Sequence, residues 1–285
     1  MKILVLGASG MIGSKIFQVL SKGDGTLVYG SIRSDKDRYF FNPSLHDSLV
    51  ANVDAIGSYT LLKLFNRLKP DVVVNCIGLT KHQVNSNDPK ITIPLNTFLP
   101  HRLVYLCGLV NARLIHISTD CVFSGEKGYY AEQDNTDAID LYGKSKALGE
   151  LTNFPNAITL RTSTIGPELR TKYGLLEWFL SQTESCKGFS RAIFSGLPSV
   201  VLAEIIRDVV IPRKDLSGLY HIAAKPINKF ELLGLIAKVY KKEIQIIKDD
   251  TFKIDRSLNA DRFQIATGYK APEWPELIKL MHAYK

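Results

Sequence analysis

Cysteine and histidine are scarce in this sequence, and their spacing gives no sign of a metal site. The 285-residue chain has four cysteines and six histidines. No Cys-x-x-Cys pair is present, and no histidines stand at a spacing typical of zinc ligands. We therefore predict no bound metal, and free thiols in a reducing compartment at Cys76, Cys107, Cys121 and Cys186.

Long apolar runs are also missing. The apolar stretch from Ile3 to Leu6 stops at Gly7, which is too short for a signal-peptide core, and no later segment approaches the length of a transmembrane helix. No tract is repetitive or low in complexity. With 45% hydrophobic and 22% charged residues, the composition is typical of a globular protein. We predict a cytoplasmic protein that does not bind membranes.

The chain carries a positive charge but has no long basic block. Its formal net charge is +8, and its lysines and arginines are spread along the sequence. A nucleic-acid-binding protein would be expected to concentrate them in a patch or stripe. A surplus of positive charge spread along the chain is compatible with an enzyme whose cofactor and substrate carry phosphates. We predict no nucleic-acid partner.

Short apolar segments alternate with helical patterns through the first half of the chain. The segment 71–76 (Asp-Val-Val-Val-Asn-Cys) is β-branched and apolar, as expected of a strand covered on both faces. Strands separated by helices in this rhythm predict a parallel sheet with right-handed crossovers, an α/β, Rossmann-like doubly wound fold. The expected strands are 2–6, 27–32, 49–53, 71–76, 113–118 and 157–161, and the expected helices are 11–20, 59–68, 99–109 and 141–151.

The alternation breaks after residue 161, where glycine and proline interrupt mixed segments. We predict a Rossmann domain over 1–162 and a smaller C-terminal lobe over 163–285 that mainly binds substrate. A strand candidate at 219–223 is expected to be among the segments that return to the first domain, and a helix is expected at 229–240.

A glycine-rich turn follows the first expected strand. It reads Gly7-Ala-Ser-Gly-Met-Ile-Gly13. Glycines let the backbone approach a pyrophosphate, which then lies at the helix N-terminus against free N–H groups. A plain strand–helix turn is the alternative, but the position after strand one of a βαβ unit favours a dinucleotide site. The residues predicted to bind the cofactor here are Gly7, Ser9, Gly10, Met11, Ile12 and Gly13.

The end of the second expected strand carries a cation where NAD sites usually carry a carboxylate. Such sites place Asp or Glu about 20 residues after the glycine motif, where it accepts from the ribose 2′-hydroxyl. Here residues 31–34 read Ser-Ile-Arg-Ser, and the first carboxylate after the expected strand is Asp35. Arg33 can pair bidentately with a 2′-phosphate, although a solvated loop arginine is the alternative. We predict NADP, used as NADPH, as the cofactor.

A tyrosine and a lysine stand four residues apart at the start of an expected helix. This spacing places Tyr142 and Lys146 on one helix face, one turn apart. An ammonium near a phenol lowers the pKa of the phenol, so that Tyr142 can donate a proton as hydride arrives. The lysine can also hold the nicotinamide ribose. An exposed helix start is the alternative, since this spacing is common by chance.

Hydroxyl side chains end the strand that precedes this helix. Leu-Ile-His-Ile at 114–117 is followed by Ser118 and Thr119. The carboxyl ends of strands are where doubly wound folds bind ligands. Thr119 could therefore hydrogen-bond a substrate carbonyl and stabilise its developing charge, or cap the local backbone instead. Together with the glycine loop, these residues favour catalysis.

The motifs together resemble a known family. The spacing Gly-x-x-Gly-x-x-Gly is typical of short-chain dehydrogenases, and the chain is similar to the extended type, within it to the dTDP-4-dehydrorhamnose reductase family. The resemblance spans nearly the whole chain and lies in 7–13, 73–78, Asn96, 117–125, 142–150, 160–162, 218–221 and 256–259.

This resemblance implies a reaction and a set of site residues. It implies NADPH-dependent reduction of a nucleotide-linked 4-keto-6-deoxysugar in surface polysaccharide biosynthesis. Thr119, Tyr142 and Lys146 would be the catalytic residues. The cofactor site would be lined further by Asn75, Ile77, Gly78 and Thr162.

The chain departs from the family at one position near the expected substrate. Cys121 stands where the family usually has an aromatic residue. We interpret this cysteine as a small neutral filler in the substrate site, rather than a nucleophile, and the departure leaves the sugar open. Arg191, in a glycine-rich segment, is a candidate ligand of the substrate diphosphate, with a surface role as the alternative.

Three other functions remain open. A nucleotide-sugar epimerase that retains NAD, and a combined epimerase and reductase, would share the tyrosine–lysine pair. A non-catalytic regulatory subunit on the same fold is the third, although it would not need Thr119, Tyr142 and Lys146. A dehydratase is disfavoured because residues 119–121 read Thr-Asp-Cys and lack a second carboxylate. Extended reductases are often dimers, but no interface is visible in the sequence, which leaves the oligomeric state open between a homodimer and other forms.

Overall fold

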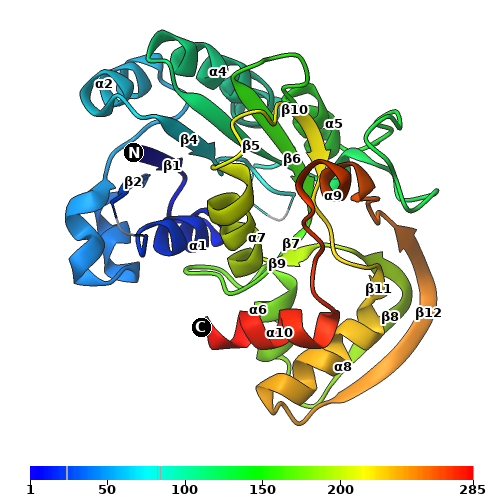
Figure 1. Ribbon diagram of the computed structural model, residues 1–285. Helices are drawn as coiled ribbons and strands as arrows, with labels where there is room; N and C mark the ends of the chain where they lie inside the picture. The colour runs from blue at the N-terminus through cyan, green and yellow to red at the C-terminus, as the bar shows by residue number, and fades with distance from the viewer. Residues whose placement is uncertain (24, 82, 84, 285) are drawn as a thin grey trace.

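A seven-stranded parallel sheet forms the centre of the protein. The computed structural model describes residues 1–23, 25–81, 83 and 85–284 (Figure 1). The strands lie in the order β10-β6-β5-β4-β1-β2-β3, and every neighbouring pair is parallel. Their bounds are β1 (Lys2–Leu6), β2 (Leu27–Ser31), β3 (Leu49–Val50), β4 (Val72–Asn75), β5 (Arg113–Thr119), β6 (Ala157–Thr162) and β10 (Gly218–His221).

Helices cover both faces of this sheet. One face carries α2 (Ser58–Leu68), α4 (Leu99–Leu109) and α5 (Leu141–Leu148), and the other carries α1 (Met11–Leu20) and α7 (Ser199–Ile205) (Figure 1). Alternate residues of β1 enter separate cores, with Ile3 on the α1 side and Leu4 on the α2 and α4 side. Strands buried on both faces explain the near-continuous apolar runs in the sequence.

Shorter elements connect these layers. They comprise α3 (Pro89–Ile93), the 3₁₀ helices η1 (Asp35–Phe40), η2 (Pro43–Ser48) and η4 (Asp120–Val122), and the π-helical turns η3 (Pro94–Phe98) and η5 (Ile206–Val210).

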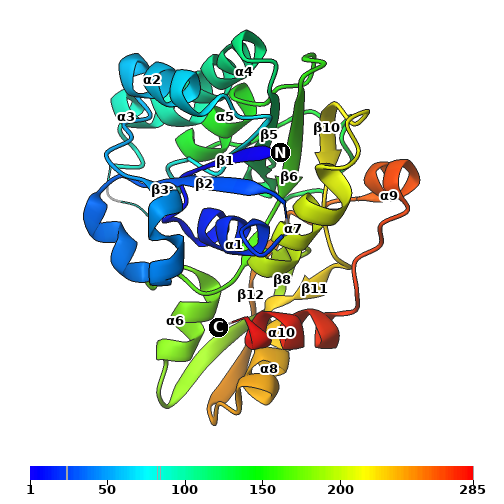
Figure 2. The same ribbon diagram turned by 60° about the vertical axis from the view of Figure 1, so that its left-hand side comes forward.

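The C-terminal part builds a smaller layer beside the main sheet (Figure 2). A second sheet has the order β11-β8-β12, in which β12 is parallel to β8, and β7 pairs with β9. The strands are β7 (Thr164–Ile165), β8 (Ser185–Phe194), β9 (Leu197–Pro198), β11 (Ile227–Asn228) and β12 (Gln245–Asp255). The accompanying helices are α6 (Leu175–Ser181), α8 (Lys229–Tyr240), α9 (Asp261–Thr267) and α10 (Trp274–Ala283).

The strand order contains a switch point next to β1. Chain connections leave β1 towards β2 on one side and leave β4 towards β5 on the other. Ligands in open α/β sheets bind in the crevice at such a point, at the carboxyl ends of the strands. The fold therefore places the glycine turn after β1 beside the segment after β4.

The predicted fold class is confirmed, and most of the expected elements of the first half are present within a few residues. Segments after residue 163 do return to the main sheet: β10 pairs with β6, and α7 packs on α1. The division into a Rossmann domain and a substrate lobe stays a prediction. The pairing of β8 with β12 was not expected from the sequence. No helix in the described part of the chain is both long and apolar enough to cross a bilayer.

Candidate active site

The glycine turn forms a cradle that leaves no room for a side chain at Gly7 or Gly13. Gly7 has a φ of +79°, and a Cβ added there would lie 3.0 Å from Ile77 Cγ1. A Cβ on Gly13 would lie 2.2 Å from the Gly7 carbonyl oxygen. The cap residue of α1, Gly10, makes no side-chain cap, so the first N–H groups of the helix have no side-chain acceptor. Such a helix start suits a pyrophosphate.

The other residues predicted to bind the cofactor here are partly buried: Ser9 lies in the turn, and Met11 and Ile12 begin α1. The end of β2 contacts the same loop, because the Gly7 N–H donates to Ser31 Oγ at 3.0 Å. Arg33 is exposed two residues further on. Together these features fit a dinucleotide that carries a 2′-phosphate.

The segment after β4 closes the other side of the crevice. Asn75 is fully buried at the end of β4, and its Oδ1 accepts from the Ile77 N–H at 3.1 Å. Gly78 lies close to Lys146, whose Nζ would be 3.8 Å from a Cβ at that position. The structure thus brings Ile77 and Gly78 between the glycine cradle and the predicted catalytic lysine.

Asn96 ties this segment to helix α5, a role that sequence spacing alone did not reveal. Its side chain accepts from the Leu79 N–H at 2.8 Å and donates to the Leu79 carbonyl at 3.1 Å. The same amide donates to Ser145 Oγ at 3.1 Å, inside α5. Asn96 therefore holds the loop after β4 against the helix that carries Tyr142 and Lys146.

Thr119, Tyr142 and Lys146 meet at the carboxyl end of β5. The Thr119 hydroxyl donates to Asp120 Oδ1 at 3.1 Å and accepts from the Cys121 N–H at 3.1 Å, and it lies near enough to Tyr142 to affect the pKa of the phenol. Lys146 Nζ donates to the Ile117 carbonyl at 2.7 Å and is buried. Burial lowers the pKa of Lys146 to about 8. Three groups suited to proton transfer and carbonyl binding therefore lie together.

The pKa of Tyr142 moves upward rather than downward. Burial raises it, nearby Cys121 and Asp120 add to the rise, and the neighbouring Thr119 hydroxyl opposes it. We expected the Lys146 ammonium to lower the pKa of Tyr142, and this effect is not seen in the structure. Tyr142 is therefore a protonated phenol at neutral pH, which is the form that a proton donor requires.

The start of α5 is built to bring Tyr142 close to β5. Asp140 caps the helix by accepting from the Gly143 N–H at 2.7 Å. A Cβ on Gly143 would lie 2.2 Å from the Cys121 carbonyl oxygen, so only glycine allows this approach. The helix can therefore pack directly on the turn that follows Thr119.

A buried charge network supports the catalytic strand, and sequence reasoning missed it. Arg161 on β6 donates to both oxygens of Glu150, at 2.7 Å each, and Ser118 Oγ donates to the same carboxylate at 2.7 Å. Arg161 Nη1 lies 3.2 Å from His221 Nε2. Burial, aided by the Arg161 charge, lowers the pKa of His221 to about 3, so the imidazole is neutral and can accept from Arg161. The motif stretches 142–150, 160–162 and 218–221 meet in this network.

Cations gather around Cys121, where the family usually has an aromatic ring. Arg256 Nε donates to the Phe123 carbonyl at 2.7 Å, and its Nη1 donates to Cys121 Sγ at 3.7 Å. Burial lowers the pKa of Lys229, and the charges of Lys81 and Arg256 lower it further. Within the described residues, Lys81, Lys229 and Arg256 form no ion pair. These three side chains make the region next to Thr119 positive, and the buried Asp120 carboxyl balances part of their charge.

The remaining predicted site residues, Cys121, Thr162 and Arg191, lie at different distances from Thr119 and Tyr142. Cys121 is partly buried, and burial raises the pKa of its thiol to about 12, so it is a neutral side chain. Thr162 is buried at the end of β6, in register with Thr119. Arg191 is exposed on β8, in register with Lys253, and shares no hydrogen bond or ion pair with the catalytic group among the described residues.

All four cysteines are free, and no cluster of candidate metal ligands exists among the described residues.

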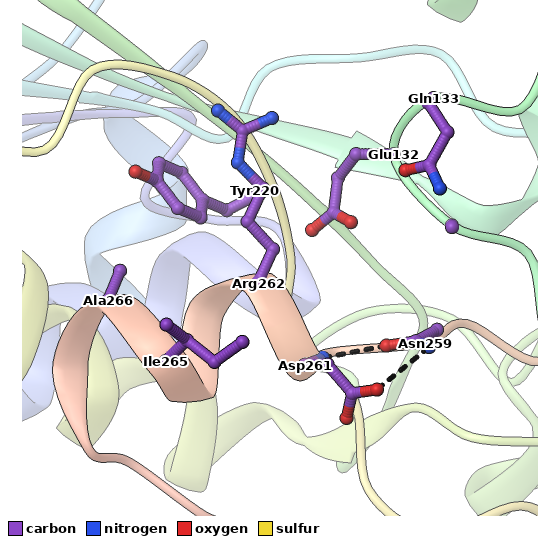
Figure 3. Close-up of a pocket in the computed structure, with 9 residues that line it drawn as sticks. Glu132, Gln133, Tyr220, Asn259, Asp261, Arg262, Ile265 and Ala266 are labelled. Carbon is purple, nitrogen blue, oxygen red and sulfur yellow. Dashed lines mark hydrogen bonds between the residues drawn. The ribbon is translucent and has the colours of Figure 1, made fainter.

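A surface cleft of about 430 Å³ lies beside α9 and involves none of the predicted site residues (Figure 3). The Arg262 guanidinium lies 4.8 Å from the Tyr220 ring centroid there. We assign the site from the chemistry at the ends of the strands rather than from the size of this cleft.

Comparison with known proteins identifies the family of the chain. The family model of the RmlD substrate binding domain matches residues 1–282. A dTDP-4-dehydrorhamnose reductase of Aggregatibacter actinomycetemcomitans is 23% identical, with 99% of both chains covered. The probable low-salt glycan biosynthesis reductase Agl14 of Haloferax volcanii is 32% identical over 58% of this chain, and the match spans 54% of that protein's length.

Solved structures share the fold over the whole chain. A dTDP-4-dehydrorhamnose reductase of Clostridium acetobutylicum superposes with a TM-score of 0.81 and 23% identity, covering 100% of this chain and 99% of that one. The corresponding protein of Bacillus anthracis, in complex with NADP, has a TM-score of 0.80 and 20% identity, with 100% and 98% covered. At this identity the likeness establishes the fold. Because the family model matches almost the entire sequence, the chain belongs to the RmlD substrate binding domain family.

Proposed function

We propose that this protein is an NADPH-dependent reductase that converts a keto group of a nucleotide-linked sugar into a hydroxyl. One observation carries the proposal: α5 packs on the end of β5, which places Tyr142 next to Thr119 and lets Lys146 Nζ donate to the Ile117 carbonyl at 2.7 Å, close to Gly78. The reductase names of family relatives, and the NADP in the Bacillus anthracis protein, support it.

The glycine cradle and the start of α1 would hold the pyrophosphate of the cofactor, while Arg33 would meet the 2′-phosphate. Asn75, Ile77, Gly78 and Thr162 would line the nicotinamide end. When bound, the cofactor supplies a hydride to the carbonyl carbon. Lys146 would hold the nicotinamide ribose, because its ammonium is fixed by the Ile117 carbonyl beside Gly78.

Tyr142 acts as the proton donor in this scheme. Its hydroxyl proton passes to the carbonyl oxygen as the carbonyl carbon is reduced, so the ketone gains one hydride and one proton. The raised pKa of Tyr142 keeps this proton in place until the transfer. Thr119 donates a hydrogen bond to the same oxygen and stabilises the charge that develops on it.

The substrate is proposed to be a nucleotide-linked 4-keto-6-deoxysugar, used in surface polysaccharide synthesis. The positive region of Lys81, Lys229 and Arg256 suits the phosphates of a nucleotide sugar. Cys121 would leave more space next to the sugar than an aromatic residue. Arg191 remains a candidate contact for the diphosphate from the exposed face of β8.

Mass spectrometry of the protein incubated with NADPH and a panel of nucleotide-linked 4-keto sugars tests the proposal. We expect NADPH to be consumed in equal amount to the sugar reduced, with a mass gain of two hydrogens. Conversion of a sugar to its epimer without loss of NADPH would identify an epimerase instead. No reaction, together with tight binding to another enzyme, would indicate a regulatory subunit.

We further propose that the protein is cytoplasmic and forms a homodimer. Free cysteines support the first statement, since a reducing compartment keeps thiols unpaired. On α4, Tyr105 and Leu109 are 68% and 76% exposed, which supports the second. Light scattering of the purified protein would measure its mass, and a monomer at micromolar concentration would contradict the dimer.

A further inference from the structure

An ion pair joins two distant parts of the chain at the expected adenosine end of the cofactor site. Arg170, in the connection between β7 and α6, pairs with Asp37 in η1. Its guanidinium also lies 5.5 Å from the Phe40 ring centroid. Figure 2 shows η1, which follows β2 in blue, and α6 in light green on the same side of the molecule. The C-terminal part of the chain therefore reaches the turn that follows Arg33.

Asp37 is held rigidly in that turn. Its N–H donates to the Ser34 carbonyl at 3.0 Å, and the Ser34 side chain accepts from the Lys36 N–H at 3.3 Å. The Asp37 side chain is 5% exposed, whereas the Arg170 side chain is 40% exposed. A buried carboxylate thus anchors a guanidinium that still reaches solvent.

Arg33 directly precedes the turn that holds Asp37, the partner of Arg170, and its positive charge acts on Arg170. Burial lowers the pKa of Arg170, and the charge of Arg33 lowers it further. Within the described residues, Arg33 forms no ion pair, so Asp37 balances Arg170 alone. An anion bound between two neighbouring guanidinium groups offsets their mutual repulsion and hydrogen-bonds to both.

We propose that Arg170 is a second ligand of the cofactor's 2′-phosphate, positioned by Asp37, so that Arg33 and Arg170 together select NADPH over NADH. The inference rests on the proposed function, because it assumes that the adenosine ribose lies at the end of β2. A phosphate offers several acceptor oxygens and suits two planar guanidinium donors. The ribose hydroxyl of NADH offers no charge to either arginine.

A purely structural ion pair is the competing explanation. Asp37 Oδ2 is buried and has no hydrogen-bond partner among the described residues, so loss of Arg170 would leave its carboxylate poorly compensated. A structural role predicts lower thermal stability and equal loss of both nucleotides. A phosphate ligand predicts a loss confined to the phosphorylated one.

Isothermal titration with 2′,5′-ADP and with 5′-AMP separates these explanations. The two probes differ only in the 2′-phosphate, so the ratio of their affinities cancels any general damage to the adenosine site. In Arg170→Met we expect the preference for 2′,5′-ADP to fall by roughly ten- to a hundredfold, as lost charge-assisted contacts typically do. Arg33→Met should act in the same direction.

Arg213→Met is the matched control, since Arg213 is 42% exposed and also pairs with an aspartate, Asp215, away from this turn. It should leave the ratio unchanged. If Arg170→Met unfolds, the double variant Asp37→Asn/Arg170→Met removes both charges and should still lose the preference. An unchanged ratio of the two affinities in a folded Arg170 variant would overturn the inference about Arg170 but leave the proposed function standing. Equal affinity of the unmutated protein for both probes would overturn the proposed NADPH preference as well.

Discussion

Replacing Glu150 by glutamine should destabilise the protein more than any single change at its surface. Glu150 and Arg161 are 5% and 4% exposed, and three contacts of 2.7 Å meet on the carboxylate, two from Arg161 and one from Ser118. Glutamine keeps the shape but turns one acceptor into a donor that faces the guanidinium. Arg161 would then be a buried charge with only neutral partners.

The size of the effect follows from the cost of an uncompensated buried charge. Breaking a buried pair by removing one partner costs about 3–5 kcal/mol in the free energy of unfolding. At about 2–4 °C per kcal/mol for chains of comparable length, the melting temperature should fall by roughly 6–20 °C.

Differential scanning calorimetry measures this shift, and two variants sharpen it. The double variant Glu150→Leu/Arg161→Met removes both charges and should be more stable than Glu150→Gln, since apolar replacements of buried pairs are often well tolerated. Asp215→Asn breaks the exposed pair with Arg213 and should leave the melting temperature unchanged. A Glu150→Gln protein with the same melting temperature as the unmutated protein would refute the reasoning.

Three further changes test the site itself. Tyr142→Phe should reduce turnover by about a hundred- to ten-thousandfold while NADPH still binds, and undiminished turnover would contradict its role as proton donor. Gly13→Ala should weaken NADPH binding and destabilise the fold by about 1–3 kcal/mol, because the new Cβ would lie 2.2 Å from the Gly7 carbonyl oxygen. An unchanged melting temperature in calorimetry and an unchanged NADPH affinity in titration would contradict this. The folded-state pKa of Lys146, about 8, lies below its ordinary value of 10.5, so the unfolded chain binds more protons between these pH values. The unmutated protein should therefore gain stability relative to Lys146→Met as the pH rises from about 8 to about 10.5; parallel melting curves of the two proteins across this range would contradict it.

Local patterns predicted the first half of the fold well. The apolar runs around β1 and β4 and the glycine turn between β1 and α1 carry their own signals, since a buried parallel strand needs apolar residues on both faces. The second half was harder to predict. β8 and β12 mix polar and apolar residues, and their pairing depends on contacts between segments separated by α8.

The candidate site divides in the same way. Tyr142 and Lys146 share a helix face, and the glycines share one turn, so their spacing predicted that each set lies together, while their roles stay predictions. Arg256 lies 135 residues from Cys121 in the sequence, and Arg170 lies far from Asp37, so no periodicity connects either pair. The sequence by itself determined the strands, the cradle and the tyrosine–lysine pair, because these depend on neighbours within one or two turns of chain. Only the tertiary structure decided which charges meet, because ion pairs and burial depend on where distant segments pack, and burial in turn decides the pKa values of Tyr142 and Lys146.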